Sequence, residues 1–248
     1  MHCWNGFLLA SCLAFAPVAE VLQENSGPTA QVEKGEKGES GQKAEQPDKR
    51  PSTAKELFAR FAKMEGLEVS FVEKKHIALL AIPLESSGKI YFVRPGYLTR
   101  IVEKPTESRL TITPTQLHLK NSREDKVIDL RQNAELRAFV TSLLHVFAGD
   151  QEQLEKSYKV LFELDKKDES KWMLSLTPLK KPLTEMLRSL RLEGSGAAVS
   201  LIEMHEPSGD KTVTKVLVNN PKRRFTDKEK KSLFGIEAEK SKPETDSR

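Results

Sequence analysis

Cysteine is nearly absent from this chain. Its 248 residues contain two, Cys3 and Cys12, and both lie in the N-terminal stretch of residues 1–19. If that stretch is removed on export, the remaining chain has no cysteine. Such a chain excludes a disulfide framework, a thiolate metal site and a thiol nucleophile.

Long hydrophobic runs are also missing, since no stretch approaches the roughly 20 apolar residues that span a bilayer. The longest run, residues 7–16, has the length of a signal-peptide core, and Ala14-Phe15-Ala16 forms a small-x-small cleavage pattern. We therefore expect residues 1–19 to be a signal peptide that directs the protein to the periplasm. Two departures are the lack of Lys or Arg before the core and the position of Pro17, and a buried N-terminal helix is the alternative. The Leu-Ala-Ser-Cys sequence ending at Cys12 resembles a lipidation signal, but the apolar run continues beyond it, which favours an ordinary core cysteine.

A strong excess of one charge is missing as well, because 40 Lys and Arg face 36 Asp and Glu, for a net charge of +4. A dedicated nucleic-acid binder carries a much stronger basic excess, so we expect no nucleic acid as partner. The five histidines are far apart, and no two have a metal-ligand spacing. No nucleophile elbow and no phosphate loop occurs. We expect no catalysis, no metal and no cofactor; a hydrolase with an unrecognised site is the remaining enzymatic alternative.

Two segments are polar and poor in apolar residues. Residues 20–52 are dominated by Gly, Pro, Glu, Lys, Gln and Ser, and residues 237–248 form a tail of mixed charge. Such segments bury too little apolar surface to offset the entropy of ordering them. We predict a disordered linker, a disordered tail, and one folded domain at 53–236.

Within that domain the hydrophobic pattern changes period. A capping box at Thr53 and Glu56 begins a predicted helix at 54–65, and a broad apolar stripe at helical spacing predicts a second helix at 133–148. Short connections between strand-like runs indicate antiparallel neighbours, so the sequence predicts an α+β fold that is mainly antiparallel β. The strand-like runs lie at 67–82, 88–94, 97–104, 109–113, 116–120, 126–130, 158–164, 172–176, 187–192, 199–204 and 213–218.

Three of these runs, at 77–82, 90–93 and 160–162, are apolar on both faces. A half-solvated antiparallel strand alternates between apolar and polar residues instead. One face must cover the core or helices. The other face lines a second apolar space, or the strands are buried on both sides as in a sandwich; the pattern leaves both open.

The segment at 88–105, GKIYFVRPGYLTRIVEKP, has two strand-forming flanks around Arg94-Pro95-Gly96. Proline and glycine cannot continue a central ladder, so the chain turns there. This string resembles the Arg-Pro hairpin of LolA-type periplasmic lipoprotein carriers. Three more segments resemble strands of that family in the same order, at 69–74, 174–178 and 203–218, although Glu73 stands where glutamine is common.

The resemblance implies a fold and a function. The fold is a curved, unclosed β-barrel with helices covering an apolar cavity, and the two predicted helices would form the lid. The family carries acyl chains of lipoproteins from an inner-membrane release complex to an outer-membrane receptor, so lipoprotein acyl chains or other lipids and these two membrane partners are implied for this chain. We expect a monomer. The rival hypothesis is a periplasmic protein-docking or sensing module of the same fold that carries no lipid.

Site residues follow from the same resemblance. Arg94 matches the arginine that latches the lid through hydrogen bonds to helix backbone; a solvated arginine beside a turn is the alternative. Arg100 stands where the family often has tryptophan, which implies a more polar cavity mouth. The basic segment at 215–231 is either a solvated face or a docking site for anionic lipid headgroups or an acidic partner. The residues expected to line the cavity or contact the lid are Phe71, Phe92, Tyr97, Phe139, Leu143 and Phe147.

Overall fold

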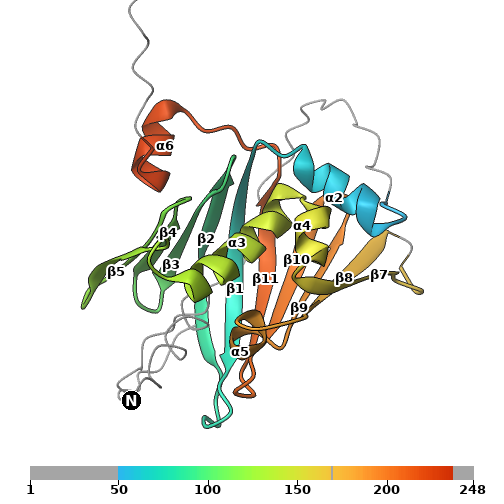
Figure 1. Cartoon of the computed structure of the whole chain (residues 1–248), viewed down its shortest axis with the longest axis horizontal. Helices are drawn as coiled ribbons and strands as arrows, with labels where there is room; N and C mark the ends of the chain where they lie inside the picture. Colours follow the sequence, from blue (N-terminus) through green and yellow to red (C-terminus); the bar gives the residue numbers. More distant parts are fainter. Residues whose placement is uncertain (1–49, 169, 237–248) are drawn as a thin grey trace, which may run out of the picture.

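The computed structural model describes residues 50–168 and 170–236 (Figure 1). The predicted signal peptide, nearly all of the predicted linker and the predicted tail lie outside the described residues. No helix in the described ranges is both long enough and apolar enough to cross a membrane.

Eleven strands form one antiparallel sheet, in the order β6-β5-β4-β3-β2-β1-β11-β10-β9-β8-β7. The first and last strands pair at its centre, and each half of the chain continues outward to an edge, β6 or β7. The sheet is unclosed, and the predicted α+β class with mainly antiparallel strands is confirmed. The strands are β1 (Gly66–His76), β2 (Leu84–Val93), β3 (Tyr97–Lys104), β4 (Ser108–Ile112), β5 (Gln116–Asn121), β6 (Asp125–Asp129), β7 (Tyr158–Leu164), β8 (Lys171–Pro178), β9 (Ser189–Ser195), β10 (Ala198–His205) and β11 (Lys211–Asn220).

Helices α3 and α4 connect the two edge strands and therefore cross one face of the sheet, beside α2 (Figure 1). Eleven flat strands spaced about 4.8 Å apart would extend over roughly 48 Å. The 15 residues of α3 cover only about 22 Å at about 1.5 Å per residue. Ile112 of β4 and Leu190 of β9 lie six strand spacings apart in the sheet, yet both line one cavity beside α3, so the sheet curls around the helices and this is its concave face. The helices are α2 (Ala54–Ala62), α3 (Ala134–Ala148), α4 (Gln151–Glu155), α5 (Leu183–Met186) and α6 (Asp227–Phe234).

Side-chain caps define the two main concave-face helices. The hydroxyl of Thr53 accepts the N–H of Glu56 at the start of α2, as the capping box predicts. Asn133 caps α3 through the N–H of Leu136, and Gly149 ends that helix in the left-handed conformation with φ of 70°. Both helices thus begin and end close to where the sequence pattern places them.

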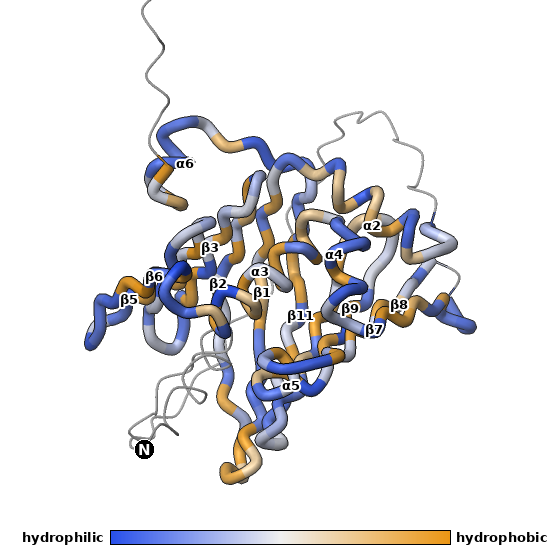
Figure 2. Tube along the Cα trace, viewed as in Figure 1, coloured by the Kyte–Doolittle hydropathy of each residue, from blue (hydrophilic) through white to orange (hydrophobic). Residues whose placement is uncertain are grey.

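The prediction of a strand through 77–82 was wrong. Strand β1 ends at His76, Lys75 pairs with Leu84 of β2, and the chain between them forms a turn. Three apolar side chains of this loop point into solvent, with 92% of Leu79, 51% of Leu80 and 77% of Ile82 exposed. Figure 2 shows the loop as a hydrophobic segment at the bottom of the view. The apolar run alone could not specify a strand, because no neighbouring strand reaches far enough to pair with it.

The second apolar face of 90–93 has a different explanation. Tyr91 and Val93 pack against Phe225 and Phe234, the second of which lies in α6, on the opposite face from α3. A helix that the sequence analysis missed therefore covers this face, and no second apolar space is needed. In 160–162, by contrast, Val160 and Phe162 pack against the core while half of Leu161 is exposed.

Candidate functional site

A cavity of about 100 Å³ lies between α3 and the concave face of the sheet. Helix α3 lines it with Leu143, Leu144, Val146 and Phe147. The sheet contributes mostly aliphatic side chains from strands far apart in the sequence: Ile90, Leu98, Ile112, Leu190, Leu192, Ile202 and Met204. Its wall is thus almost wholly apolar on both sides.

The position of the cavity follows from how α3 is packed. One edge of its apolar stripe, including Phe139 and Val146, packs into a core shared with α2 and β7–β10. The other edge, including Leu136 and Val140, packs into a second core built mainly on β1–β5. The cavity opens where these two cores meet, and there Phe147 stacks on Phe92 with 5.5 Å between ring centroids.

Arg94 holds the ends of both concave-face helices. Its Nε donates to the carbonyl of Met64 at 2.7 Å, and its Nη2 donates to the carbonyls of Phe61 at 2.9 Å and Ala148 at 3.0 Å. These carbonyls lie at the C-terminal ends of α2 and α3, where helix carbonyls lack intrahelical donors and the helix dipole favours a cation. One guanidinium therefore caps two helices at once.

The two helices also touch closely beside this arginine. A Cβ atom at Gly149 would lie 2.3 Å from the carbonyl oxygen of Phe58 and 2.5 Å from the backbone nitrogen of Ala62. Only glycine permits this approach as well as the left-handed backbone. The end of α3 is thereby held against α2.

A third contact fixes the middle of α3. The hydroxyls of Ser142 and Tyr158 are 2.7 Å apart, and the Ser142 hydroxyl also donates to the Phe139 carbonyl. Tyr158 begins β7, and burial raises the pKa of its hydroxyl, so it remains an uncharged partner. Polar contacts thus tie α3 to the sheet at one point and to α2 at its end.

One end of the cavity is polar. Glu73 of β1 and Arg100 of β3 are 5% and 4% exposed, and Arg100 Nη2 donates to Glu73 Oε1 at 2.9 Å. The carboxylate also accepts from the hydroxyls of Thr214, at 2.8 Å, and Ser86, at 3.4 Å. Burial lowers the pKa of the Arg100 guanidinium, while Glu73 opposes that shift. The guanidinium carbon lies 4.7 Å from the ring centre of Phe71.

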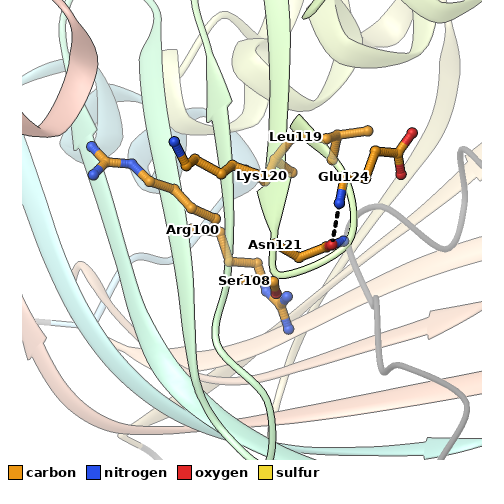
Figure 3. A pocket seen from close by; sticks show the side chains of 8 residues that line it. Arg100, Ser108, Leu119, Lys120, Asn121 and Glu124 are labelled. Atoms are coloured by element: carbon orange, nitrogen blue, oxygen red, sulfur yellow. Dashed lines mark hydrogen bonds between the residues drawn. The ribbon is translucent and has the colours of Figure 1, made fainter. Parts of the chain in front are cut away.

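A smaller pocket lies beside strands β3–β5 and measures about 20 Å³. Figure 3 shows Arg100, Lys120, Asn121 and Glu124 around it, with the guanidinium of Arg100 pointing away from the others. That group turns toward Glu73 instead, so this pocket is separate from the charged end of the cavity. Within residues 50–168 and 170–236, no three His, Cys, Asp or Glu side chains gather to hold a metal ion.

The profile of one protein family matches residues 49–222, which is more than half of the chain. Its description is "Outer membrane lipoprotein carrier protein LolA-like". The chain belongs to this family. The resemblance inferred from the Arg-Pro hairpin is confirmed.

Among solved structures, a LolA superfamily protein from Nitrosomonas europaea is 11% identical, with a TM-score of 0.39; the alignment covers 72% of this chain and 97% of that one. A chain of the MucA/MucB complex of Pseudomonas aeruginosa is 12% identical, with a TM-score of 0.41, and the alignment covers 67% of this chain and 56% of that one. LprF from Mycobacterium bovis is 10% identical, with a TM-score of 0.34, and the alignment covers 71% of this chain and 100% of LprF. Similarity at this level carries no argument about ligand or partner. No curated protein matches the chain.

In this LolA-like protein the expected site residues fall into three groups. Leu143 and Phe147 line the cavity, and Phe92 lies directly behind Phe147. Arg94 lies at the joined ends of α2 and α3. The remaining three lie elsewhere: Phe139 is in the core beside α2, Tyr97 packs with the α6 cluster, and Phe71 lies beneath Arg100.

Helical spacing alone could not separate these groups, because it marks an apolar stripe without showing which part of the stripe meets a packed neighbour. Sequence reasoning missed Leu144, which belongs to the same stripe, and the polar residues Thr212 and Thr214. The alternation of Thr212 and Thr214 along β11 was the available signal, since it places both side chains on one face of the sheet.

The basic segment 215–231 is partly neutralised in the LolA-like structure. Arg223 pairs with Glu68 and Glu229, and Arg224 pairs with Glu65. The Thr226 and Glu229 capping box then starts α6 inside this segment. The segment thus contains a helix boundary with its own ion pairs, rather than only a solvated face.

Proposed function

We propose that this protein is a non-enzymatic periplasmic carrier that binds acyl chains of lipoproteins or related lipids and passes them between membranes. The observation that carries the proposal is the apolar cavity beneath α3. Its release and receiving partners would be an inner-membrane complex and an outer-membrane receptor, as the resemblance to LolA-type carriers implies.

The size of the cavity bears on how binding proceeds. Apolar cavities of roughly 150 Å³ accept a ligand the size of benzene, and this cavity is about 100 Å³. A longer acyl chain therefore requires α3 to move away from the sheet. Each methylene buried in that way contributes about 0.8 kcal/mol, so several methylenes can offset the contacts broken on opening.

Those contacts suit a lid. Polar ties hold α3 through Arg94 at its end and Ser142 in its middle. A guanidinium fork makes its hydrogen bonds in one rigid geometry, so one displacement of the helix ends breaks them together. Arg94 is proposed as the latch of this lid.

A cavity-filling variant tests the proposal. Ile202 of β10 lines the cavity, and Ile202→Trp should fill it. The matched control is Leu217→Trp on β11, where 64% of the leucine is exposed. We expect a synthetic diacylated peptide to displace Nile red from the full chain and from the control, with at least tenfold weaker displacement from Ile202→Trp. If the peptide displaces Nile red equally well from both variants, the acyl chains do not bind in this cavity.

A second candidate is a protein-docking module of the same fold, and one observation favours it. The 77–82 loop exposes Leu79, Leu80 and Ile82 to solvent, and exposed apolar groups of this kind mark interaction sites. The diacylated peptide can be tested by calorimetry and by dye displacement on the unchanged chain, Ile202→Trp and Leu217→Trp. If it binds none of these three proteins, the docking module is favoured.

A further inference from the structure

The polar end of the cavity has more hydrogen-bond donors than acceptors. All hydrogen bonds of the Arg100 guanidinium within the described part of the chain come from Nη2, so Nε and Nη1 have no acceptor there. Thr212 also lines the cavity and is 4% exposed, and its hydroxyl has no hydrogen-bond partner among the described residues. The Glu73 carboxylate, by contrast, already accepts from three side chains.

These groups lie together because of the strand register. Glu73 pairs with Thr214 of β11 and with Ser86 of β2, and Thr212 lies two residues along β11 on the same face. Arg100 reaches Glu73 from β3 across β2. A belt of polar side chains thus crosses four adjacent strands where the apolar wall of the cavity ends.

A buried donor without a partner destabilises the protein, and the Thr212 hydroxyl is such a donor. A ligand acceptor at this end would remove that penalty, whereas a purely hydrocarbon ligand would leave it. The belt therefore discriminates between ligands that carry an oxygen acceptor and ligands that do not.

The charge of the belt restricts the acceptor further. Arg100 pairs with Glu73, and Lys75, which is 4% exposed, pairs with Glu206 at 3.1 Å. Within these two pairs the charges cancel, so neither pair has positive charge left to balance an added anion. Burying an uncompensated carboxylate is strongly unfavourable, while a neutral carbonyl oxygen needs only the donors.

We propose that Arg100 and Thr212 form a subsite for the neutral carbonyl oxygen of an acyl ester or amide. The subsite selects acylated lipids over ether lipids and over free fatty acid anions. The inference rests on the proposed function, because it specifies the ligand class of the same cavity. Arg100 donates through its unused N–H groups, and Thr212 donates its hydroxyl.

The test compares three small ligands by isothermal titration calorimetry on the full chain. Methyl octanoate and octyl methyl ether differ only in a carbonyl oxygen, and octanoate supplies the anion. We expect the ester to bind about tenfold more tightly than the ether and more tightly than octanoate. Equal binding of ester and ether overturns the subsite and leaves acyl binding intact, whereas no binding of any ligand overturns the proposed function. If octanoate binds more tightly than the ester, the subsite prefers an anion, and the proposal of a neutral carbonyl is wrong.

Variants locate the effect. Thr212→Val keeps the side-chain shape and removes the unpartnered hydroxyl, so it should fold with an unchanged or higher unfolding midpoint and lower the ester preference by a few fold. Arg100→Met with Glu73→Gln removes the guanidinium without leaving a buried charge, and it should abolish the preference. The control Thr177→Val lies at an exposed position of β8 and should keep it. Full ester preference in Thr212→Val would exclude Thr212 from the subsite.

Discussion

Removal of the Arg94 side chain should loosen the helices over the cavity while leaving the sheet intact. Arg94→Leu deletes three hydrogen bonds, to the carbonyls of Phe61, Met64 and Ala148. A hydrogen bond from a charged donor contributes about 1.5–3 kcal/mol. Water can reach part of this half-buried site and replace some of the lost donors, so the full sum is not expected. We estimate that the closed arrangement of α2 and α3 loses about 2–4 kcal/mol.

This loss corresponds to an increase of roughly 30- to 1,000-fold in the population of the open lid, since about 1.4 kcal/mol is a factor of ten. Hydrogen exchange monitored by mass spectrometry measures it directly, because amides of α3 exchange when the lid opens. Peptides from α3 should exchange about 100-fold faster in Arg94→Leu, whereas peptides from the central β1 and β11 pair should change much less.

The matched control is Arg123→Leu, at an exposed turn between β5 and β6. It should leave exchange in α3 unchanged. If Arg94→Leu also left α3 unchanged, the three hydrogen bonds would not hold the lid. Equal acceleration of α3 and of the central strands would show global destabilisation in place of a latch.

Two further predictions concern charged groups. Glu73→Leu alone should lower the free energy of unfolding by about 3–5 kcal/mol, because it leaves the buried Arg100 without its carboxylate. Adding Arg100→Met should recover most of that loss. If denaturant melts show that the losses of the two single variants add up in the double variant, the two side chains are not a coupled pair. The side chain of Arg131, and then its backbone N–H, donate to the partly buried Asp129 and lower the pKa of that carboxyl from 3.8 to about 2. The pair therefore favours the folded state above pH 3.8, and this contribution is lost as the pH falls through about 2. NMR titration of Arg131→Ala should show a higher pKa for Asp129. An unchanged pKa would show that the Arg131 side chain does not lower it.

Much of the fold could be predicted from the sequence, because strand alternation and helical stripes are local. The hairpin around Arg94-Pro95 and the helix ending at Gly149 contain their own turn and cap signals. The 77–82 loop could not be predicted in this way. All six of its residues are apolar, which predicts a buried strand, and only the lack of a pairing strand in the described sheet decides against it.

The candidate site was predictable in part for a related reason. Leu143 and Phe147 belong to a helix stripe that the sequence displays, but their separation from Phe139 depends on which core each side of α3 meets. The polar belt depends on pairing between residues as far apart as Glu73 and Thr214. Such register is set by the whole sheet, and no local pattern contains it.

The proposed carrier function requires acyl chains to bind beneath α3, and photo-crosslinking can locate them there. A diacylated peptide with a diazirine at the end of one chain would be irradiated with the full-length protein and its attachment sites mapped by mass spectrometry. We expect crosslinks to Leu143, Leu144 and Phe147 and to the inward-facing residues of β9 and β10. Crosslinks confined to the 77–82 loop or to the outer face of β11, with none beneath α3, would contradict it.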